Sequence, residues 1–341
     1  MSGSLRFLSA DDVTACLPSV EERLMLAERS MVALVADAEL PPKIGVHPRP
    51  AGSFAHAMPA SLRPLHGAPG GDDDLLGMKW VTGFGGDRAK GIPAIHALVI
   101  LSDPSTGVPR AILDGGPITA HRTAAISGLA ISRFAASPPS SGEPSRRMVV
   151  RAALIGAGVQ GHSHLAMLGH VLPGVELVVH DRHPERAAEL AALAGRTAGI
   201  GAARTARRLA DATKGADVVV TAVSFTDAAQ RGELIPESLA PEALVVAIDY
   251  ATMVAPSVAR QAALFVVDDR GQFQAGRDGG LFDGYPDPAM TLGEAILAGV
   301  GRPRSGRMMV SHLGVGLADL VFADAILRRA EAVGLGTLLR T

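Results

Sequence analysis

The sequence predicts an α/β protein of two domains, and three observations support this fold class. The chain has 341 residues, which is more than one ordinary hydrophobic core holds. Its second half alternates short apolar runs with helix-like segments, the order that produces a parallel sheet covered by helices. Its first part contains a helix-like segment and then several short β-like runs. We therefore expect an N-terminal α+β domain followed by a doubly wound parallel-sheet domain.

The first elements follow from helix-capping signals. Residues 5–8 are an apolar strand candidate, and Ser9 stands before two aspartates as a helix cap. Ser19 and Glu22 have the spacing of a capping box, which predicts a helix to about Ala36. The apolar residues of that segment recur every three to four positions, so one helix face should be buried.

A mostly antiparallel sheet is expected next. Residues 103–107 form a turn signal that predicts a hairpin, and Thr119 is predicted to cap a helix from Ala120 to Ala136. The β-like runs are IGVHP (44–48), SFAHAMPA (53–60), LGMKWVTGF (76–84), IHALVILS (95–102) and PRAIL (109–113).

Residues 137–147, SPPSSGEPSRR, read as a linker. After them the alternation of strands and helices begins, and it closes with a late strand at 308–311 and a helix at 318–333. The expected parallel strands are 150–155, 176–180, 217–222, 243–248 and 263–267.

The stretch from 150 to 181 carries the strongest functional signal. An apolar strand leads into Gly156-Ala157-Gly158-Val159-Gln160-Gly161, and a second apolar run ends at Asp181. Gly156 permits the tight turn, Gly158 lets the backbone approach a pyrophosphate, and Gly161 lets helix and strand pack closely. The helix N-terminus, with Val159 and Gln160, offers N–H groups to phosphates. This pattern predicts a Rossmann domain that binds a nicotinamide dinucleotide.

Composition excludes several classes of protein. The net charge of −2 gives no reason to expect nucleic acid or a membrane surface as partner, and no apolar run approaches the length of a membrane span. The first residues lack the pattern of a signal peptide. Cys16 is the only cysteine, and His47, His56 and His312 have no ligand spacing, so no metal is predicted. We expect a cytoplasmic enzyme.

Particular segments resemble the ornithine cyclodeaminase/mu-crystallin family. They are Gly77-Met78-Lys79-Trp80-Val81, Gly91-Ile92-Pro93, Leu101 to Gly107, Ile118 to Ala125 and Leu313 to Asp319, together with their spacing to the glycine motif. The resemblance implies a homodimer formed through the N-terminal domain, with substrate between that domain and the nicotinamide. It also implies that the C-terminal helix completes the N-terminal domain. The expected domains are thus 1–136 with 312–341 (substrate binding and dimerisation) and 147–311 (dinucleotide binding).

Three basic residues are the candidates for holding an amino or imino acid. Arg122 can offer a planar fork to a carboxylate. Lys79 is flanked by Met78 and Trp80, and an apolar setting would lower the pKa of its ammonium toward that of a useful acid or base. By resemblance these residues match the family's carboxylate-binding arginine and its lysine. Lys43 stands where the family has an arginine, and it is a candidate second cation for the carboxylate.

Asp249 ends a predicted strand and should face the crevice at the strand C-termini. The resemblance implies an acid here that holds the substrate amine, but the family carries it at the position of Ala251. Either Asp249 takes over that role or Asp249 is structural. Ser224, after another strand, is expected beside the cofactor. Asp181 favours NAD because it suits a ribose 2′-hydroxyl, although Arg182 leaves NADP possible.

These residues together predict an NAD(P)-dependent oxidoreductase acting on the C–N bond of a small amino or imino acid. Hydride would pass between the nicotinamide and the α-carbon, with Lys79, Arg122 and Asp249 as the catalytic candidates. Two alternatives stay open. One is an ornithine cyclodeaminase-type lyase with internally recycled NAD, and the other is a non-catalytic dinucleotide-binding protein like the crystallins.

Overall fold

A computed structural model describes residues 4–50, 52–64, 73–85, 92–135, 150–224 and 234–340. The chain divides into two compact units, the first made of Met1–Arg122 with Gly314–Thr341 and the second of Thr123–Leu313. The predicted linker 137–147 lies outside the described residues, and the predicted domain limits stay predictions. Of the helices described, none combines the length and apolar character needed to cross a bilayer.

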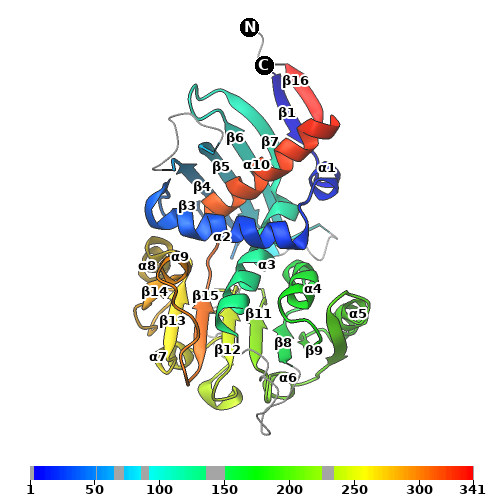
Figure 1. Cartoon of the computed structure of the whole chain (residues 1–341), viewed down its shortest axis with the longest axis vertical. Coiled ribbons are helices and arrows are strands. Elements are labelled where there is room, and N and C mark those ends of the chain that lie inside the picture. The colour runs from blue at the N-terminus through cyan, green and yellow to red at the C-terminus, as the bar shows by residue number, and fades with distance from the viewer. Residues whose placement is uncertain are drawn as a thin grey trace. The chain divides into compact units, whose positions relative to one another are not determined.

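Unit 1 is built on a mixed sheet with the order β16-β1-β7-β6-β5-β4-β2, in which β3 pairs with β4. The predicted hairpin is confirmed, since β6 and β7 pair antiparallel. The last strand of the chain pairs with the first, so the two termini lie side by side (Figure 1). The strands are β1 (Ser4–Leu8), β2 (Ala38–Glu39), β3 (Ile44–Val46), β4 (Phe54–Leu62), β5 (Leu75–Gly83), β6 (Ile95–Ser102), β7 (Pro109–Asp114) and β16 (Thr337–Arg340).

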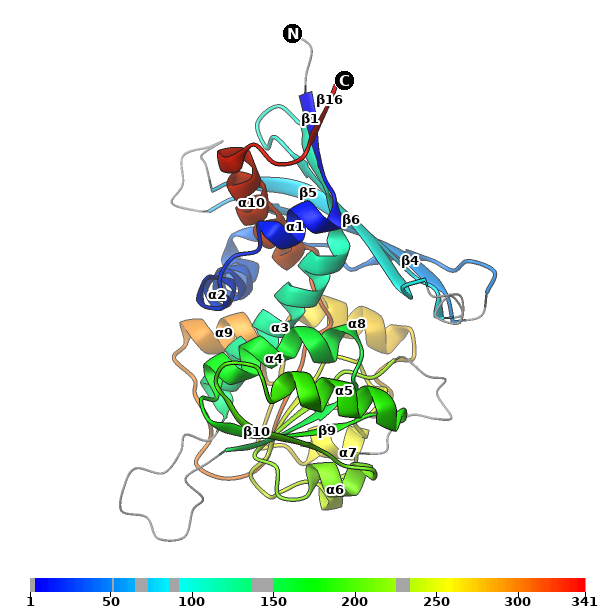
Figure 2. The same cartoon turned by 90° about the vertical axis from the view of Figure 1, so that its right-hand side faces the viewer.

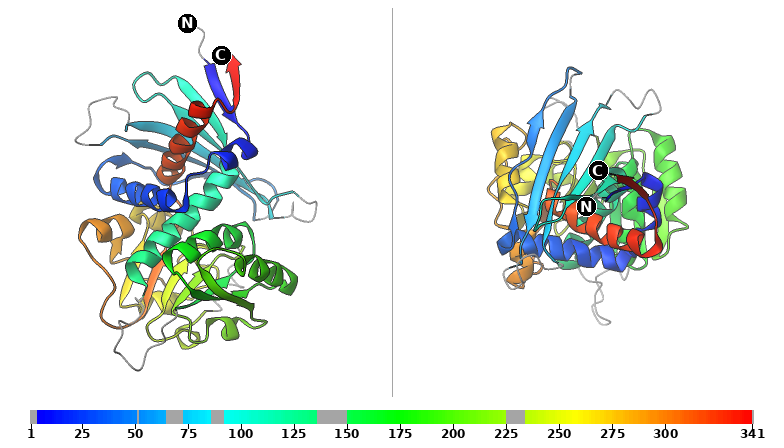
Figure 3. Two further views of the ribbon diagram at one scale, coloured as in Figure 1. Left: turned by 45° about the vertical axis from the view of Figure 1, so that its right-hand side comes forward. Right: turned by 90° about the horizontal axis from the view of Figure 1, so that it is seen from above.

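Helices cover one face of this sheet. Helix α10 (Gly316–Val333) packs on β4, β5 and β6, and α2 (Val20–Ala36) lies against α10 (Figure 3). The short α1 (Ala10–Ala15) and α2 both have capping boxes, at Ser9 with Asp12 and at Ser19 with Glu22. The predicted starts of these two helices are therefore confirmed.

Helix α3, Gly115–Phe134, begins earlier than Ala120, the start predicted from the sequence. The Thr119 hydroxyl donates to the Gly115 carbonyl 2.6 Å away, so Thr119 lies inside the helix. Asp114 is the residue that accepts a first-turn N–H, from Gly116 at 2.8 Å. The prediction that Thr119 caps this helix is wrong, because Asp114, five residues earlier, already accepts a hydrogen bond at the helix start.

Unit 2 contains a sheet in the order β10-β9-β8-β11-β12-β15-β13-β14, and all of its neighbouring pairs are parallel. Every side chain of β11, β12 and β15 is buried, as expected for central parallel strands. The strands are β8 (Arg151–Ile155), β9 (Val175–His180), β10 (Ile200–Thr205), β11 (Val218–Thr221), β12 (Leu244–Ala247), β13 (Leu264–Val267), β14 (Met290–Thr291) and β15 (Met308–Ser311).

The helices of unit 2 connect these parallel strands, and α5 runs along β9 and β10 (Figure 2). They are α4 (Val159–Val171), α5 (Pro184–Ala194), α6 (Leu209–Thr213), the 3₁₀ turn η3 (Pro236–Ser238), α7 (Pro256–Arg260), α8 (Arg270–Asp278) and α9 (Leu292–Leu297). The order places the C-terminal ends of β8, β11 and β12 at one edge of the sheet, which is the edge where doubly wound proteins bind ligands.

Candidate functional site

The turn between β8 and α4 carries the predicted glycine motif. Gly156 has φ of +111°, and an added Cβ would lie 2.4 Å from the carbonyl oxygen of Ala222. A Cβ on Gly161 would lie 2.3 Å from the carbonyl oxygen of Gly156. At Gly158, by contrast, a Cβ would meet no atom within 4 Å. Two of the glycines are thus required by packing, whereas Gly158 borders open space through which a ligand can reach the backbone.

Helix α4 begins at Val159, and its N-cap, Gly158, makes no side-chain cap bond. The first-turn N–H groups, including those of Val159 and Gln160, therefore remain available to a ligand. The positive end of the helix dipole adds to the attraction for an anion. The side chain of Val159 is 70% exposed, so it does not close off this end of the helix. The turn and the helix start fit a pyrophosphate group.

Asp181 follows β9 and is held beside the glycine turn. Its Oδ2 accepts a hydrogen bond from the Ala157 N–H at 2.7 Å, and Oδ1 accepts one from the His183 N–H at 2.8 Å. Each oxygen keeps a second lone pair, which suits it to accept from a ribose hydroxyl. Arg182, the next residue, is exposed. The residues at this edge of the sheet fit a nicotinamide dinucleotide.

Asp249 lies just after β12, and its carboxylate joins the ends of two strands. Oδ1 accepts from the Thr221 hydroxyl at 2.9 Å and Oδ2 from the Val223 N–H at 3.2 Å. The side chain is 1% exposed, and burial raises its pKa to about 7 against the opposing effect of these hydrogen bonds. Ser224, the last described residue after β11, is exposed next to this junction. Ala251, at the position of the family acid, is buried.

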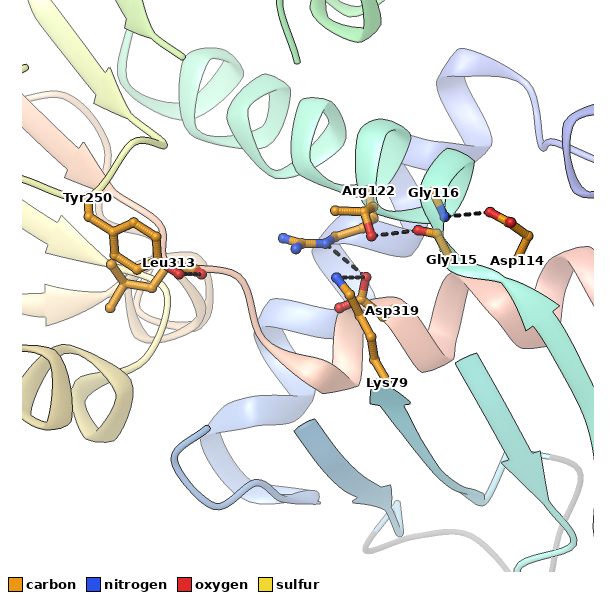
Figure 4. A network of polar contacts seen from close by, with 9 residues as sticks. Lys79, Asp114, Gly115, Gly116, Arg122, Tyr250, Leu313 and Asp319 are labelled. Carbon is orange, nitrogen blue, oxygen red and sulfur yellow. Dashed lines mark hydrogen bonds and ion pairs between the residues drawn. The ribbon is translucent and has the colours of Figure 1, made fainter. Parts of the chain in front are cut away.

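Tyr250 has an unusual backbone conformation. Its φ of +56° lies in the left-handed region, where side chains other than glycine are uncommon. Its hydroxyl donates to the carbonyl oxygen of Leu313 at 3.1 Å (Figure 4). This bond ties the segment after β12 to the segment after β15. Backbone strain of this kind is concentrated at functional sites.

In unit 1, Lys79 and Arg122 meet at one carboxylate. Lys79 Nζ on β5 lies 3.0 Å from Asp319 Oδ1, and Arg122 Nε on α3 lies 3.1 Å from the same oxygen (Figure 4). All three side chains are buried, since Lys79 is 2% exposed, Arg122 is 5% and Asp319 is 0%. Asp319 belongs to α10, so the cluster joins a strand and two helices. Two cations and one anion leave a net positive charge in a buried position.

The electrostatics of this cluster suit Lys79 to proton transfer. Burial lowers the pKa of Lys79 to about 8, and the positive charge of Arg122 acts in the same direction. The charge and hydrogen bond of Asp319 oppose this effect. An ammonium with such a pKa can both hold and release a proton near neutral pH.

The guanidinium of Arg122 uses only Nε for Asp319. Neither Nη1 nor Nη2 makes a hydrogen bond to any residue that the structure describes. An added Cβ on Gly314 would lie 2.8 Å from Nη1 and 2.7 Å from Nη2, so the guanidinium lies against a backbone without a side chain. A planar pair of donors held in this way is suited to bind a carboxylate.

The third substrate candidate, Lys43, lies one residue before β3 and is half-buried. Its charge contributes to lowering the pKa of Lys79. The structure thus groups Lys43, Lys79 and Arg122 in unit 1. The cofactor candidates and Asp249 belong to unit 2.

Asp319 was not among the site residues predicted from the sequence. It was named only as the last residue of a segment that resembles the family. The available signal was an acid within the apolar residues of a helix, because a buried acid needs a partner. The partners themselves were not predictable, since Lys79 lies 240 residues away and Arg122 lies 197 residues away.

A second missed cluster lies in unit 2. The Ser127 hydroxyl is 2.9 Å from His164 Nε2 and 2.8 Å from His312 Nε2, and all three residues are buried. His164 Nδ1 lies 2.6 Å from the carbonyl oxygen of Gln160, which can only accept. Nδ1 therefore carries the hydrogen, and burial lowers the pKa of His164 to about 4, which keeps its ring neutral. His164 Nε2 accepts from Ser127, so the chain of bonds supports the first turn of α4.

Metal binding has no candidate among the residues placed in the structure, where no group of three or more histidine, cysteine, aspartate or glutamate side chains could hold an ion.

Comparison with known proteins gives consistent results. The model of the ornithine cyclodeaminase/mu-crystallin family matches residues 7–329. The nodulation efficiency protein NfeD of Rhizobium meliloti is 33% identical over 307 residues, which are 88% of this chain and 87% of the relative. Ketimine reductase mu-crystallin of Mus musculus is 28% identical over 254 residues, 74% of this chain and 76% of the relative.

A solved structure extends the comparison to the fold. The structure of Thermococcus litoralis Delta(1)-pyrroline-2-carboxylate reductase in complex with NADH and L-proline aligns with a TM-score of 0.81 at 24% identity. The alignment covers 98% of this chain and 99% of that chain. The predicted fold class and the predicted family are both confirmed.

Proposed function

The chain belongs to the ornithine cyclodeaminase/mu-crystallin family, and from this premise we propose that it is an NAD(P)-dependent oxidoreductase that reduces the C=N bond of a small imino acid. One observation carries the proposal. The chain combines a glycine turn that fits a dinucleotide with a buried Lys79, Asp319 and Arg122 cluster that suits a carboxylate and a proton donor. The naming of relatives as ketimine and pyrroline-2-carboxylate reductases supports the same reaction class.

Substrate binding is assigned first to Arg122. Its Nη1 and Nη2 bind the two carboxylate oxygens, while Nε stays on Asp319 and fixes the plane of the fork. Lys43 adds positive charge nearby. Because Asp319 already neutralises one of the two buried cations, an anionic substrate balances the remaining charge.

We assign to Lys79 the donation of a proton to the imine nitrogen. Reduction of an imine adds a hydride to carbon and a proton to nitrogen, and NADH becomes NAD⁺. The bound nicotinamide supplies the hydride. The Lys79 ammonium, held at 3.0 Å from Asp319 and with a pKa of about 8, supplies the proton to the nitrogen.

Asp249 is assigned a positioning role. Its carboxylate is already bonded to the Thr221 hydroxyl and the Val223 N–H, so it orders the strand end that leads to Ser224. The other role left open by the sequence is direct steering of the substrate nitrogen. A carboxylate that is 1% exposed would first have to exchange one of these bonds for the substrate.

We propose NAD rather than NADP as the preferred cofactor. Asp181 is fixed beside the glycine turn by two backbone N–H groups, and a carboxylate at the ribose repels a 2′-phosphate. Arg182 is exposed and is the residue that would favour NADP if Asp181 turned away.

A homodimer through unit 1 is part of the proposal. Trp80 is 39% exposed and its cross-strand neighbour Leu98 is 40% exposed, on the face of the sheet opposite to Lys79. Exposed apolar side chains that adjoin on one sheet face favour association with another copy.

The experiment that tests the function follows NADH absorbance while the purified chain is mixed with a panel of imino acids. Net oxidation of NADH that depends on imino acid supports the proposal. Ammonia release from ornithine without net change of NADH would instead indicate a cyclodeaminase. Tight NADH binding without turnover on any compound would indicate a non-catalytic protein.

A further inference from the structure

A chain of buried polar side chains leads to the first turn of α4. Ser127 lies on α3, His164 lies on α4, and His312 directly follows β15, all within unit 2. The three residues are between 0% and 2% exposed. His312 Nε2 lies 2.8 Å from the Ser127 hydroxyl oxygen, which lies 2.9 Å from His164 Nε2. Hydrogen bonds inside the protein thus join three segments that are far apart in the sequence.

The direction of the bonds in this chain is fixed by their last acceptor. His164 Nδ1 donates, because the Gln160 carbonyl oxygen 2.6 Å away can only accept. Burial lowers the pKa of His164 to about 4, so the ring is neutral and its Nε2 accepts the hydrogen of the Ser127 hydroxyl. The Ser127 oxygen then accepts from His312 Nε2. All the donors therefore point toward the Gln160 carbonyl.

Stability alone gives little reason for such a chain. Buried polar side chains give up their hydrogen bonds to water, and bonds among themselves return only a modest net gain. Apolar side chains of similar shape would fill the same space without this cost. A role of His164 as a general base is excluded too, since both of its ring nitrogens are occupied. The effect of the chain is therefore to be sought at the Gln160 carbonyl.

The Gln160 carbonyl belongs to the peptide group whose other end is the Gly161 N–H. The Ser163 hydroxyl also donates to this carbonyl oxygen, at 3.0 Å, so two side chains bond to it. Gly161 is the third residue of α4, and its N–H is among those that a helix leaves without an internal acceptor. Hydrogen bonds at a carbonyl polarise the peptide group and strengthen its N–H as a donor. The positive end of α4 is thus strengthened where a pyrophosphate would bind.

We propose that Ser127, His164 and His312 are positioning residues for the cofactor, which polarise the peptide group between Gln160 and Gly161 and thereby raise the affinity of α4 for a pyrophosphate. This inference rests on the dinucleotide site of the proposed function and not on the reaction. The three side chains act through the Gln160 carbonyl. The affinity for the cofactor then depends on residues outside the glycine motif.

The test compares the Kd of ADP, which carries a pyrophosphate, with that of adenosine, which carries none. In Ser127→Ala the Kd of ADP should rise by about threefold to tenfold, the effect of one hydrogen bond, whereas the Kd of adenosine should not change. Thr213→Val is the matched control, because it removes another buried hydroxyl of unit 2, which donates to the Ser238 carbonyl at 2.9 Å. This control should keep the wild-type Kd of both ligands. Calorimetry on the cofactor-free chain measures the binding, and thermal unfolding records any loss of stability.

Two variants of His164 separate its bond to Gln160 from its bond to Ser127. An asparagine amide reaches the place of Nδ1 and can still donate to Gln160, whereas a glutamine amide reaches the place of Nε2 and can keep the bond to Ser127. His164→Gln should therefore weaken ADP binding as much as Ser127→Ala does, and His164→Asn should weaken it less. The ¹⁵N spectrum of the histidine-labelled wild type should show the hydrogen of His164 on Nδ1 at neutral pH.

Three results would overturn the inference and leave the reductase function standing. In Ser127→Ala, ADP and adenosine could lose affinity by the same factor, which would mean that the chain only holds the fold. In Ser127→Ala or His164→Gln, ADP could bind as in the wild type. The hydrogen of His164 could also lie on Nε2, which would reverse the chain of bonds. A wild-type chain that binds no ADP would instead overturn the inference together with the dinucleotide site of the proposed function.

Discussion

Lys79 Nζ lies 3.0 Å from Asp319 Oδ1 in a position where both side chains are almost fully buried. Burial lowers the pKa of the lysine, and the positive charge of the arginine beside it acts in the same direction. Asp319 opposes both effects and holds the pKa of Lys79 at about 8. The carboxylate therefore determines whether Lys79 carries the proton that imine reduction needs.

Asp319→Asn should move the alkaline limb of the pH–rate profile to lower pH. The amide keeps the size of the side chain but removes the charge that raises the pKa of Lys79, so the lysine loses its proton earlier as pH rises. The measurement is kcat/KM against pH for wild type and variant. An unshifted limb would mean that Lys79 is not the group whose ionisation limits the rate. Thermal unfolding should also show a loss of stability, since removing one partner of a buried pair costs about 3–5 kcal/mol.

Lys79→Arg gives a sharper test of proton transfer. Arginine keeps the charge but has neither a pKa near neutral nor the compact reach of an ammonium. Turnover should fall by about 10² to 10⁴-fold, close to that of Lys79→Ala, while NADH binds normally. Arg122→Lys is the matched comparison, and it should mainly raise KM because it breaks the two-pronged carboxylate contact. If Lys79→Arg turns over at nearly the wild-type rate, Lys79 contributes only its positive charge and does not transfer the proton.

Asp249 predicts a pH dependence of stability. Its pKa is raised from 3.8 to about 7 in the folded chain, so the folded state holds a proton that the unfolded state releases. Its contribution to stability is complete below about pH 4 and is lost as pH rises to about 7. The measurement is the free energy of unfolding in urea at several pH values across this range. It should decline in the wild type as pH rises, and the part of the decline that is due to Asp249 should be absent in Asp249→Asn.

The same variant distinguishes the two roles considered for Asp249. Direct steering of the substrate nitrogen predicts a large loss of kcat, whereas a positioning role predicts a smaller loss of kcat together with reduced affinity for NADH.

The sequence was most informative where the local pattern determines structure. The apolar runs at 150–155 and 243–248 correspond to β8 and β12, because central parallel strands are buried on both faces. The edge strands β10 and β16 were not predicted, because most of their side chains are exposed and no apolar run marks them. Edge strands are defined by their neighbours rather than by their own composition.

The site was predictable to the extent that single residues reveal their chemistry. Lys79 and Arg122 were identified from residue type and family resemblance, and the structure brings them together. Asp319 was missed because its hydrogen bonds with Lys79 and Arg122 join segments that are far apart in the chain. The cluster of Ser127, His164 and His312 was missed for the same reason. Side-chain networks between distant segments leave no periodic trace in the sequence.

Asp181→Ala should relax the choice of cofactor. The wild-type chain is expected to have the higher kcat/KM with NADH, because the Asp181 carboxylate accepts from the ribose and repels a 2′-phosphate. In Asp181→Ala, the kcat/KM with NADH divided by the kcat/KM with NADPH should be lower than in the wild type by about tenfold or more. Most of this change should come from a lower KM for NADPH. Glu185→Ala is a control, since Glu185 is exposed in the first turn of α5. Equal or better efficiency of the wild type with NADPH would contradict the NAD assignment.

Gly158→Ala and Gly161→Ala should separate cofactor binding from folding within a single motif. A methyl group at position 158 meets no protein atom within 4 Å, so the variant should fold with a thermal midpoint close to that of wild type. The same methyl group occupies the space where a pyrophosphate approaches the backbone, so the Kd for NADH should rise by about tenfold or more. At position 161 the methyl group would lie 2.3 Å from the Gly156 carbonyl oxygen, and this variant should lose stability even without cofactor. Calorimetry for NADH and thermal unfolding of the cofactor-free chain measure the two effects separately. If Gly158→Ala binds NADH as tightly as wild type, the phosphates do not pass over this turn, and the glycine motif serves only to pack β8 against α4.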